Sequence, residues 1–158
     1  MTIPSEIVVE RAREGDLRAI GSLLSELMEA MTDTEGFDLN RSIENCRSLV
    51  RDPSQYVLVA RRSDAVLGFI NFSTRQTLIH PAPSALIDEL VVGREYRRAG
   101  VGKLLISAAV DKCRELGCCE VEISTEKSNT RARRFYRGLG FEEDAVLLER
   151  DLEMSDEK

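Results

Sequence analysis

The chain has 158 residues, of which 42% are apolar, and its formal net charge is −6. This length and apolar content suit one globular domain with a buried core, so we expect a single domain over residues 1–158. The negative charge argues against a general nucleic-acid binder, which needs an excess of lysine and arginine. No window of about 18 apolar residues occurs, and the N-terminus continues into charged residues; we therefore expect a cytoplasmic protein with no export signal and no membrane partner.

Cysteine and histidine are the next residues to consider. The four cysteines lack the paired spacing of zinc sites and there is one histidine, so we expect free thiols and no bound metal. Two basic clusters run against the overall charge: Arg94, Arg97, Arg98 and Lys103 in one, and Arg131, Arg133, Arg134 and Arg137 in the other. Such clusters either bind a polyanionic cofactor or are solvated helix faces.

The hydrophobic periodicity predicts a mixed fold of strands and helices. In chain order it predicts a strand at 7–11, helices at 17–31 and 39–50, strands at 56–61, 66–73 and 85–92, a helix from 101, a strand at 120–125, a helix at 128–139 and further strand at 141–152. Asp16 is the expected N-cap of the first helix, and Gly117 is expected to end the third. The order β-α-α-β-β-β-α-β-α-β-β predicts an α/β fold of the α+β type, with helices on both faces of a mixed sheet.

The third predicted helix carries the strongest local signal at its start. Its apolar stripe is Val101, Leu104, Leu105, Ala108, Ala109 and Cys113. The preceding residues 97–102 read Arg-Arg-Ala-Gly-Val-Gly, between a buried strand and this helix. A helix start with glycines offers free backbone N–H groups to a phosphate, although two glycines can also simply make a tight turn. The loop is not a Walker loop, because Leu104 follows Gly102 and Lys103, and it lacks the third glycine of the dinucleotide pattern.

Two segments together carry a resemblance to a known family. Residues 92–102 resemble the cofactor loop of the GNAT superfamily of N-acetyltransferases, whose pattern is Arg/Gln-x-x-Gly-x-Gly/Ala after an apolar strand. Residues 129–141 resemble its Asn-x-x-Ala-x-x-Phe-Tyr…Gly-Phe segment. Both occur in the family's order and separation, so the chain is identified as a GNAT member.

This resemblance implies a GNAT-type, mostly antiparallel sheet and a reaction in which acetyl-CoA, as acyl-donor substrate, acetylates a primary amine. The cofactor-binding residues that it implies are Leu90, Val91, Val92, Arg97, Arg98, Ala99, Gly100, Val101, Gly102, Lys103, Asn129 and Tyr136. A backbone N–H near Val91 or Val92 would face the thioester carbonyl. Tyr136 would protonate the departing sulfur, and otherwise is a core residue beside Phe135. Asn129 would contact the cofactor or would simply cap its helix.

The general base is sought in the predicted strand at 85–92. Residues 87–92 resemble the strand of members that act on small amines, including aminoalkylphosphonate and aminoglycoside acetyltransferases, where the acid before the leucine takes part. We therefore favour Glu89, with Asp88 as second choice and a water relay as a further alternative; either acid could instead pair with an arginine. Because the two acids are adjacent, a regular strand would point them to opposite faces.

The acceptor is the least defined part of the prediction. A small-molecule amine is favoured, with a protein N-terminus or lysine as an alternative and a non-catalytic acyl-CoA-binding module as another. His80 is expected in a loop, as a surface residue or in the acceptor pocket. The family resemblance also allows a homodimer.

Overall fold

The computed structural model describes residues 6–31 and 34–152. Residues 1–5, on which the expectation of no export signal partly depends, lie outside this description. The chain divides into two compact units, Met1–Ile123 and Ser124–Lys158. Within the described ranges, no helix combines the length and apolar character that crossing a membrane would require.

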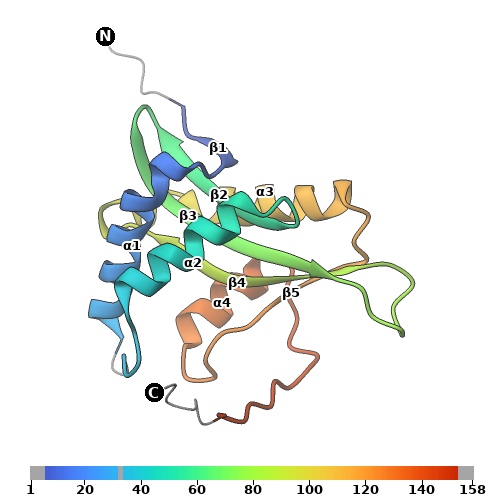
Figure 1. Cartoon of the computed structure of the whole chain (residues 1–158). Helices are drawn as coiled ribbons and strands as arrows, with labels where there is room; N and C mark the ends of the chain where they lie inside the picture. Colours follow the sequence, from blue (N-terminus) through green and yellow to red (C-terminus); the bar gives the residue numbers. More distant parts are fainter. Residues whose placement is uncertain (1–5, 32–33, 153–158) are drawn as a thin grey trace, which may run out of the picture. The chain divides into compact units, whose positions relative to one another are not determined.

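The first unit is built on a five-stranded sheet in the order β1-β2-β3-β4-β5 (Figure 1). The strands are β1 (Val8–Arg11), β2 (Gln55–Arg62), β3 (Ala65–Arg75), β4 (Ser84–Val92) and β5 (Glu120–Ile123). The first three pairings are antiparallel and the β4–β5 pairing is parallel. The expectation of a mixed, mostly antiparallel sheet is therefore confirmed.

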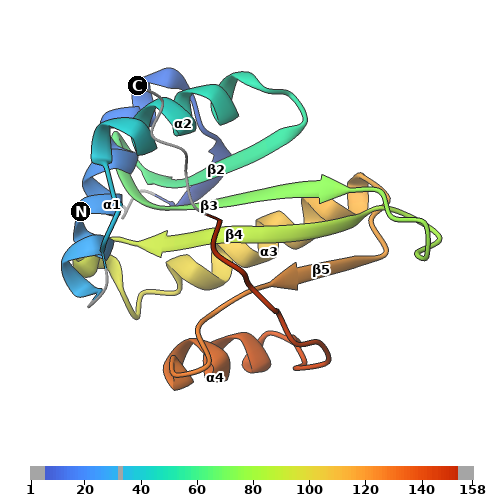
Figure 2. The same cartoon turned by 60° about the horizontal axis from the view of Figure 1, so that its bottom comes forward.

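Helices cover both faces of this sheet, as predicted (Figure 2). They are α1 (Leu17–Ala30), α2 (Leu39–Arg51) and α3 (Val101–Glu115), with short 3-10 turns η1 (Glu14–Asp16) and η2 (Arg94–Tyr96). On one face, α1 and α2 pack against a cluster that includes Val57, Val59, Phe69 and Val91. On the other, α3 approaches so closely that a Cβ atom added to Gly68 would lie 3.3 Å from Leu105 Cδ1.

Helix α3 departs from its predicted stripe at one position. Val101, Leu105, Ala109 and Cys113 are buried as expected, but Leu104 is 42% exposed and Ile106 is buried instead. The period of 3.6 residues places both positions near the edge of the apolar stripe, where only packing decides which is covered.

The C-terminal end of α3 follows the sequence prediction. Gly117 has φ +75°, its N–H donates to Arg114 O, and the N–H of Cys118 donates to Cys113 O. These two bonds form a Schellman motif, which needs a left-handed residue after the helix and so favours glycine.

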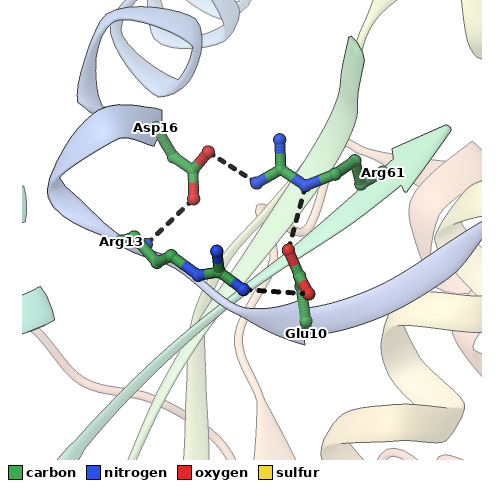
Figure 3. A network of polar contacts seen from close by, with 4 residues as sticks. All are labelled: Glu10, Arg13, Asp16 and Arg61. Atoms are coloured by element: carbon green, nitrogen blue, oxygen red, sulfur yellow. Dashed lines mark hydrogen bonds and ion pairs between the residues drawn. The ribbon is translucent and has the colours of Figure 1, made fainter. Parts of the chain in front are cut away.

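Asp16 does not cap α1 with its side chain, contrary to the sequence prediction. Its carboxylate accepts from the Arg13 backbone N–H at 2.9 Å and from Arg61 Nη2 at 2.6 Å (Figure 3). Arg61 Nε also donates to Glu10, at 3.0 Å. Because Asp16 is only 6% exposed, the guanidinium of Arg61 is a stronger partner for it than a helix N–H group.

The second unit contains α4 (Thr130–Gly138), where a helix was predicted. The further strand predicted at 141–152 is wrong, because the structure assigns these residues no strand. Their apolar side chains, including Val146 at 84% and Leu148 at 89% exposed, make the segment resemble a strand in sequence. A strand also requires hydrogen bonds to a neighbouring strand, and β-propensity alone cannot supply them.

Candidate active site

Strand β4 carries both acidic candidates, and it is irregular where they lie. Asn71 pairs with Glu89 while the next residue of β3, Phe72, pairs with Ile87. Asp88 is therefore an extra residue in β4, which makes this point a β-bulge. The expectation that the two acids point to opposite faces assumed a regular strand, so that argument does not apply here.

Glu89 lies on the face of the sheet that α1 and α2 cover. Directly opposed residues of antiparallel strands share a face. Glu89 opposes Asn71, which opposes Val57, and Val57 belongs to the core cluster beneath α1 and α2. This does not depend on the bulge, because Val91, two residues further along β4, opposes Phe69 on the same face; the bulge lets Ile87 instead of Asp88 pair with Phe72.

The environment of Glu89 favours its protonated form. Desolvation by the surrounding protein raises the pKa of Glu89, and the nearby Asp88 carboxylate raises it further. A hydrogen bond from Asn71 Nδ2 to Glu89 Oε2, at 2.6 Å, acts in the opposite direction. Desolvation also raises the pKa of Asp88. A carboxylate with a raised pKa is a better proton acceptor than an ordinary glutamate.

Beyond the bulge, β4 has an edge that β5 does not cover. The pairing of β4 with β5 runs only from Ser84 with Glu120 to Ile87 with Ile123. On the edge toward β3, the N–H of Gly93 donates to Leu67 O, whereas Val92 O, on the outward edge, accepts from Arg97 Nε. Since the groups of an antiparallel strand alternate in direction, the amides of Leu90 and Val92 point away from β3 and that of Val91 points toward it.

This stretch of β4 leads through η2 into the loop that precedes α3. Arg98 and Gly100 have positive φ angles, of 64° and 79°. The first α3 amide that bonds back into the loop is that of Leu104, which donates to Gly100 O at 3.0 Å. The amides of residues 101–103 come before Leu104 in the helix, and amides at a helix start have no carbonyl acceptor within the helix. Free amides, a helix dipole and the basic residues of this loop suit an anion such as a pyrophosphate.

The second unit holds the other two candidates. Asn129 is the N-cap of α4, with its side chain accepting from the Ala132 N–H at 3.0 Å, so the capping alternative is confirmed. Tyr136 packs edge-on against Phe135 and Phe141, with ring centroids 5.3 and 6.0 Å apart. Burial raises the pKa of Tyr136, which keeps the phenol protonated at neutral pH.

The basic cluster on α4 is partly engaged within its own unit. Arg133 Nε lies 2.7 Å from Glu143 Oε1, and Arg137 Nη2 lies 2.6 Å from the same oxygen. These guanidinium groups hold the pKa of Glu143 down at about 2. Both arginines thus have a carboxylate partner already.

His80 lies in a loop, as expected, whereas the sequence interpretation did not consider Asn71. His80 lies in the β3–β4 loop, where its ring nitrogens contact Thr77 Oγ1 at 2.7 Å and Glu120 Oε1 at 3.1 Å. Glu89 is separated from His80 along the chain by the first part of β4, which begins at Ser84. Sequence reasoning missed Asn71, because a polar residue inside an apolar strand was the only signal and its partner is 18 positions away. Among the described residues, no group of three or more metal-ligating side chains gathers.

Comparison with known proteins agrees with this architecture. A model of the acetyltransferase (GNAT) family matches residues 18–141. The chain is 26% identical to the uncharacterised N-acetyltransferase YhfO of Bacillus subtilis over 141 residues, covering 86% of this chain and 90% of that one. It is also 26% identical to the aminoalkylphosphonate N-acetyltransferase of Salmonella typhimurium over 135 residues, covering 85% and 84%.

A solved structure extends the match to three dimensions. An aminoglycoside acetyltransferase from an uncultured soil metagenomic sample superimposes with a TM-score of 0.76 at 29% identity, covering 93% of this chain and 97% of that one. The family match covers most of the chain and runs through both compact units. The protein is therefore a member of the acetyltransferase (GNAT) family and an N-acetyltransferase.

Proposed function

We propose that this enzyme transfers the acetyl group of acetyl-CoA to the primary amine of a small molecule. The observation that carries the proposal is the continuity of one stretch of chain. This stretch contains Glu89 beside the bulge, then the edge at Leu90 and Val92 that β5 does not pair with, and then the first amides of α3, which precede the helical hydrogen bonds. A base, a docking edge and an anion site are what this reaction needs from the protein.

The donor would bind along this stretch. The pyrophosphate would accept hydrogen bonds from the amides of residues 98–103, with Arg97, Arg98 and Lys103 adding positive charge. The pantetheine arm would bond to the outward amides of Leu90 and Val92, as a strand adds to a sheet edge. An N–H from these same residues would face the thioester carbonyl, because the amide of Val91 points toward β3. Asn129 would add a contact from the second unit.

The transfer itself requires three proton movements. Glu89 would take a proton from the acceptor ammonium, directly or through water, with Asp88 as the alternative base. The free amine would then form the new C–N bond at the thioester carbonyl and lose its second proton to water, and the C–S bond would break. Tyr136 would give its proton to the departing thiolate and regain one from solvent. The raised pKa values of Glu89 and Tyr136 support these assignments.

The assignment of Tyr136 and Glu89 to one reaction assumes that the chain is a single N-acetyltransferase domain over residues 1–158. The family match supports this, because it includes residues of both units. The small-amine acceptor is supported by the two relatives whose names describe aminoalkylphosphonate and aminoglycoside acetylation.

The testing experiment measures thiol release from acetyl-CoA by the purified protein. The acceptor panel contains an aminoalkylphosphonate, an aminoglycoside, other small primary amines, and peptides with a free N-terminus or a lysine. Release that depends on a small amine is the expected result. Release with peptides alone would replace the small molecule by a protein acceptor, and acetyl-CoA binding with no release would make the protein a non-catalytic acyl-CoA-binding module.

A further inference from the structure

We infer that Asn71 is a positioning residue, which holds the ionised carboxylate of Glu89 in place for proton transfer. This inference rests on the proposed function, since it deepens the role that Glu89 has there. It concerns a residue of β3 that lies outside both family-like motifs of the sequence.

The geometry of the pair is direct. Asn71 and Glu89 oppose one another in the β3–β4 ladder, and Asn71 Nδ2 donates to Glu89 Oε2 at 2.6 Å. Asn71 is only 9% exposed and lies in the ladder between Val57 and Glu89. A rigid, buried donor of this kind fixes the direction of a carboxylate better than solvent does.

Stability alone does not account for an asparagine at this position. Asn71 Oδ1 is buried and has no hydrogen-bond partner among the residues that the structure describes, which costs free energy. The neighbours of Asn71 on the same face, Val57 and Phe69, are apolar. An apolar residue of similar size would remove the unpaired oxygen. The amide of Asn71 therefore provides a hydrogen bond to Glu89 that an apolar residue could not provide, and it lowers the stability of the fold in doing so.

Asp88 and Cys46 are titratable groups that interact electrostatically with Glu89, and Asn71 is a neutral amide that donates to it. Asp88, beside it on β4, raises the pKa of Glu89 and Asn71 lowers it. Burial and the charges of Glu89 and Asp16 raise the pKa of the Cys46 thiol, on α2, to about 11. The thiol is therefore neutral throughout the range in which Glu89 titrates. Loss of the Asn71 donor should raise the pKa of Glu89 with no compensating change from α2.

The first test titrates Glu89 in the free enzyme and needs no acceptor. Its side-chain carboxyl carbon is followed by ¹³C NMR and is assigned by its absence in Glu89→Gln. In Asn71→Leu, which nearly keeps the side-chain size, we expect the Glu89 pKa to rise while the urea midpoint stays equal or increases. Asn71→Ala is the second variant, in case leucine disturbs the fold. Ser84→Ala removes the other buried unpaired side chain, at the far end of β4, and should leave the titration unchanged.

The second test uses acetyl transfer to an acceptor found with the amine panel. We expect Asn71→Leu to lower kcat/KM by roughly tenfold to a hundredfold. We also expect it to move the acid limb of the pH profile upward. In a Glu89→Gln background the same change should have no further effect, because Asn71 acts through Glu89.

The outcomes separate this inference from the proposed function. An unchanged Glu89 pKa in both Asn71 variants, or an equal loss of activity in the Glu89→Gln background, would overturn the positioning role alone. Full activity of Glu89→Gln would remove Glu89 as the base, and the inference with it. An absence of thiol release by the wild-type enzyme would instead overturn the proposed function, whatever the NMR titration shows.

Discussion

Arg61 Nη2 lies 2.6 Å from Asp16 Oδ1, so that a β2 guanidinium neutralises a nearly buried carboxylate at the start of α1 (Figure 3). The same guanidinium reaches Glu10 on β1 through Nε, at 3.0 Å. One side chain thus joins β1, β2 and the entrance to α1. Helix α1, one of the two helices on the Glu89 face of the sheet, begins here.

Replacing Arg61 should therefore destabilise the fold. In Arg61→Met the Asp16 carboxylate stays buried without its cation, and we expect a loss of about 2–3 kcal/mol in the free energy of unfolding. Urea denaturation measures it. Arg114→Met, which breaks an exposed pair with Asp111, is the control and should change stability little. Equal losses in the free energy of unfolding for the two substitutions would mean that the burial of Asp16 does not make its ion pair with Arg61 more important for stability than an exposed pair.

The loop before α3 gives a prediction for donor binding. Gly100→Glu should weaken acetyl-CoA binding roughly a hundredfold, because like charges about 5 Å apart near a protein surface repel by about 3 kcal/mol. Calorimetric titration with acetyl-CoA measures the affinity. Gly117→Glu is a matched control at the other end of the same helix, with a similar φ and equally open space around its Cβ position. Both variants should lose similar stability, since both force a side chain into the left-handed region. Normal affinity in Gly100→Glu would mean that the pyrophosphate binds elsewhere.

Tyr136 can be tested with little disturbance of its packing. Tyr136→Phe keeps the ring contacts with Phe135 and Phe141, so stability should hold while kcat falls roughly a hundredfold. The affinity for acetyl-CoA should fall much less than kcat does. This difference would show that Tyr136 acts in the chemical step and not in binding of the donor. Tyr96→Phe, in the 3-10 turn η2, serves as the control variant. An undiminished kcat in Tyr136→Phe would exclude the phenol as the acid.

The pH profile distinguishes the two acids of β4. A general base must be ionised, so kcat/KM should rise with pH through a pKa above that of an ordinary glutamate, because burial and Asp88 raise the pKa of Glu89. Asp88→Asn removes the like charge and should move this acid limb to lower pH while activity at neutral pH is kept. If activity is lost instead, Asp88 is the base and Glu89 is its neighbour.

Much of the fold was predictable from local sequence patterns. The helices at residues 17–30, 39–51, 101–115 and 130–138 and all five strands lie where periodicity placed them, within a few residues. These elements follow from the alternation of apolar and polar residues, which acts over a few positions. Gly117 ends α3 as predicted, because a left-handed backbone after a helix favours glycine.

The pairing of distant residues was not predictable in this way. The bulge at Asp88 changes the register of β3 and β4 by one residue, and no local sequence pattern predicts it. The prediction of a strand at 141–152 was wrong for a related reason, because a strand forms only where a neighbouring strand pairs with it. Asp16 does not cap α1 as expected, because its carboxylate accepts a hydrogen bond from Arg61, which is 45 residues away in the sequence.

The sequence by itself determined the order of the elements as far as α4 and the family, and it pointed to the loop at 97–102 as a candidate anion site and to Glu89 and Asp88 as candidate bases. The tertiary structure decided which groups act on one another: it placed Asn71 against Glu89, left the edge of β4 at Leu90 and Val92 unpaired by β5, and put the exposed Glu89 on the sheet face that α1 and α2 pack against. The physical reason is that periodicity sets which way a side chain points along its own element. Its proton affinity depends on desolvation and on charges and donors brought from elsewhere in the chain.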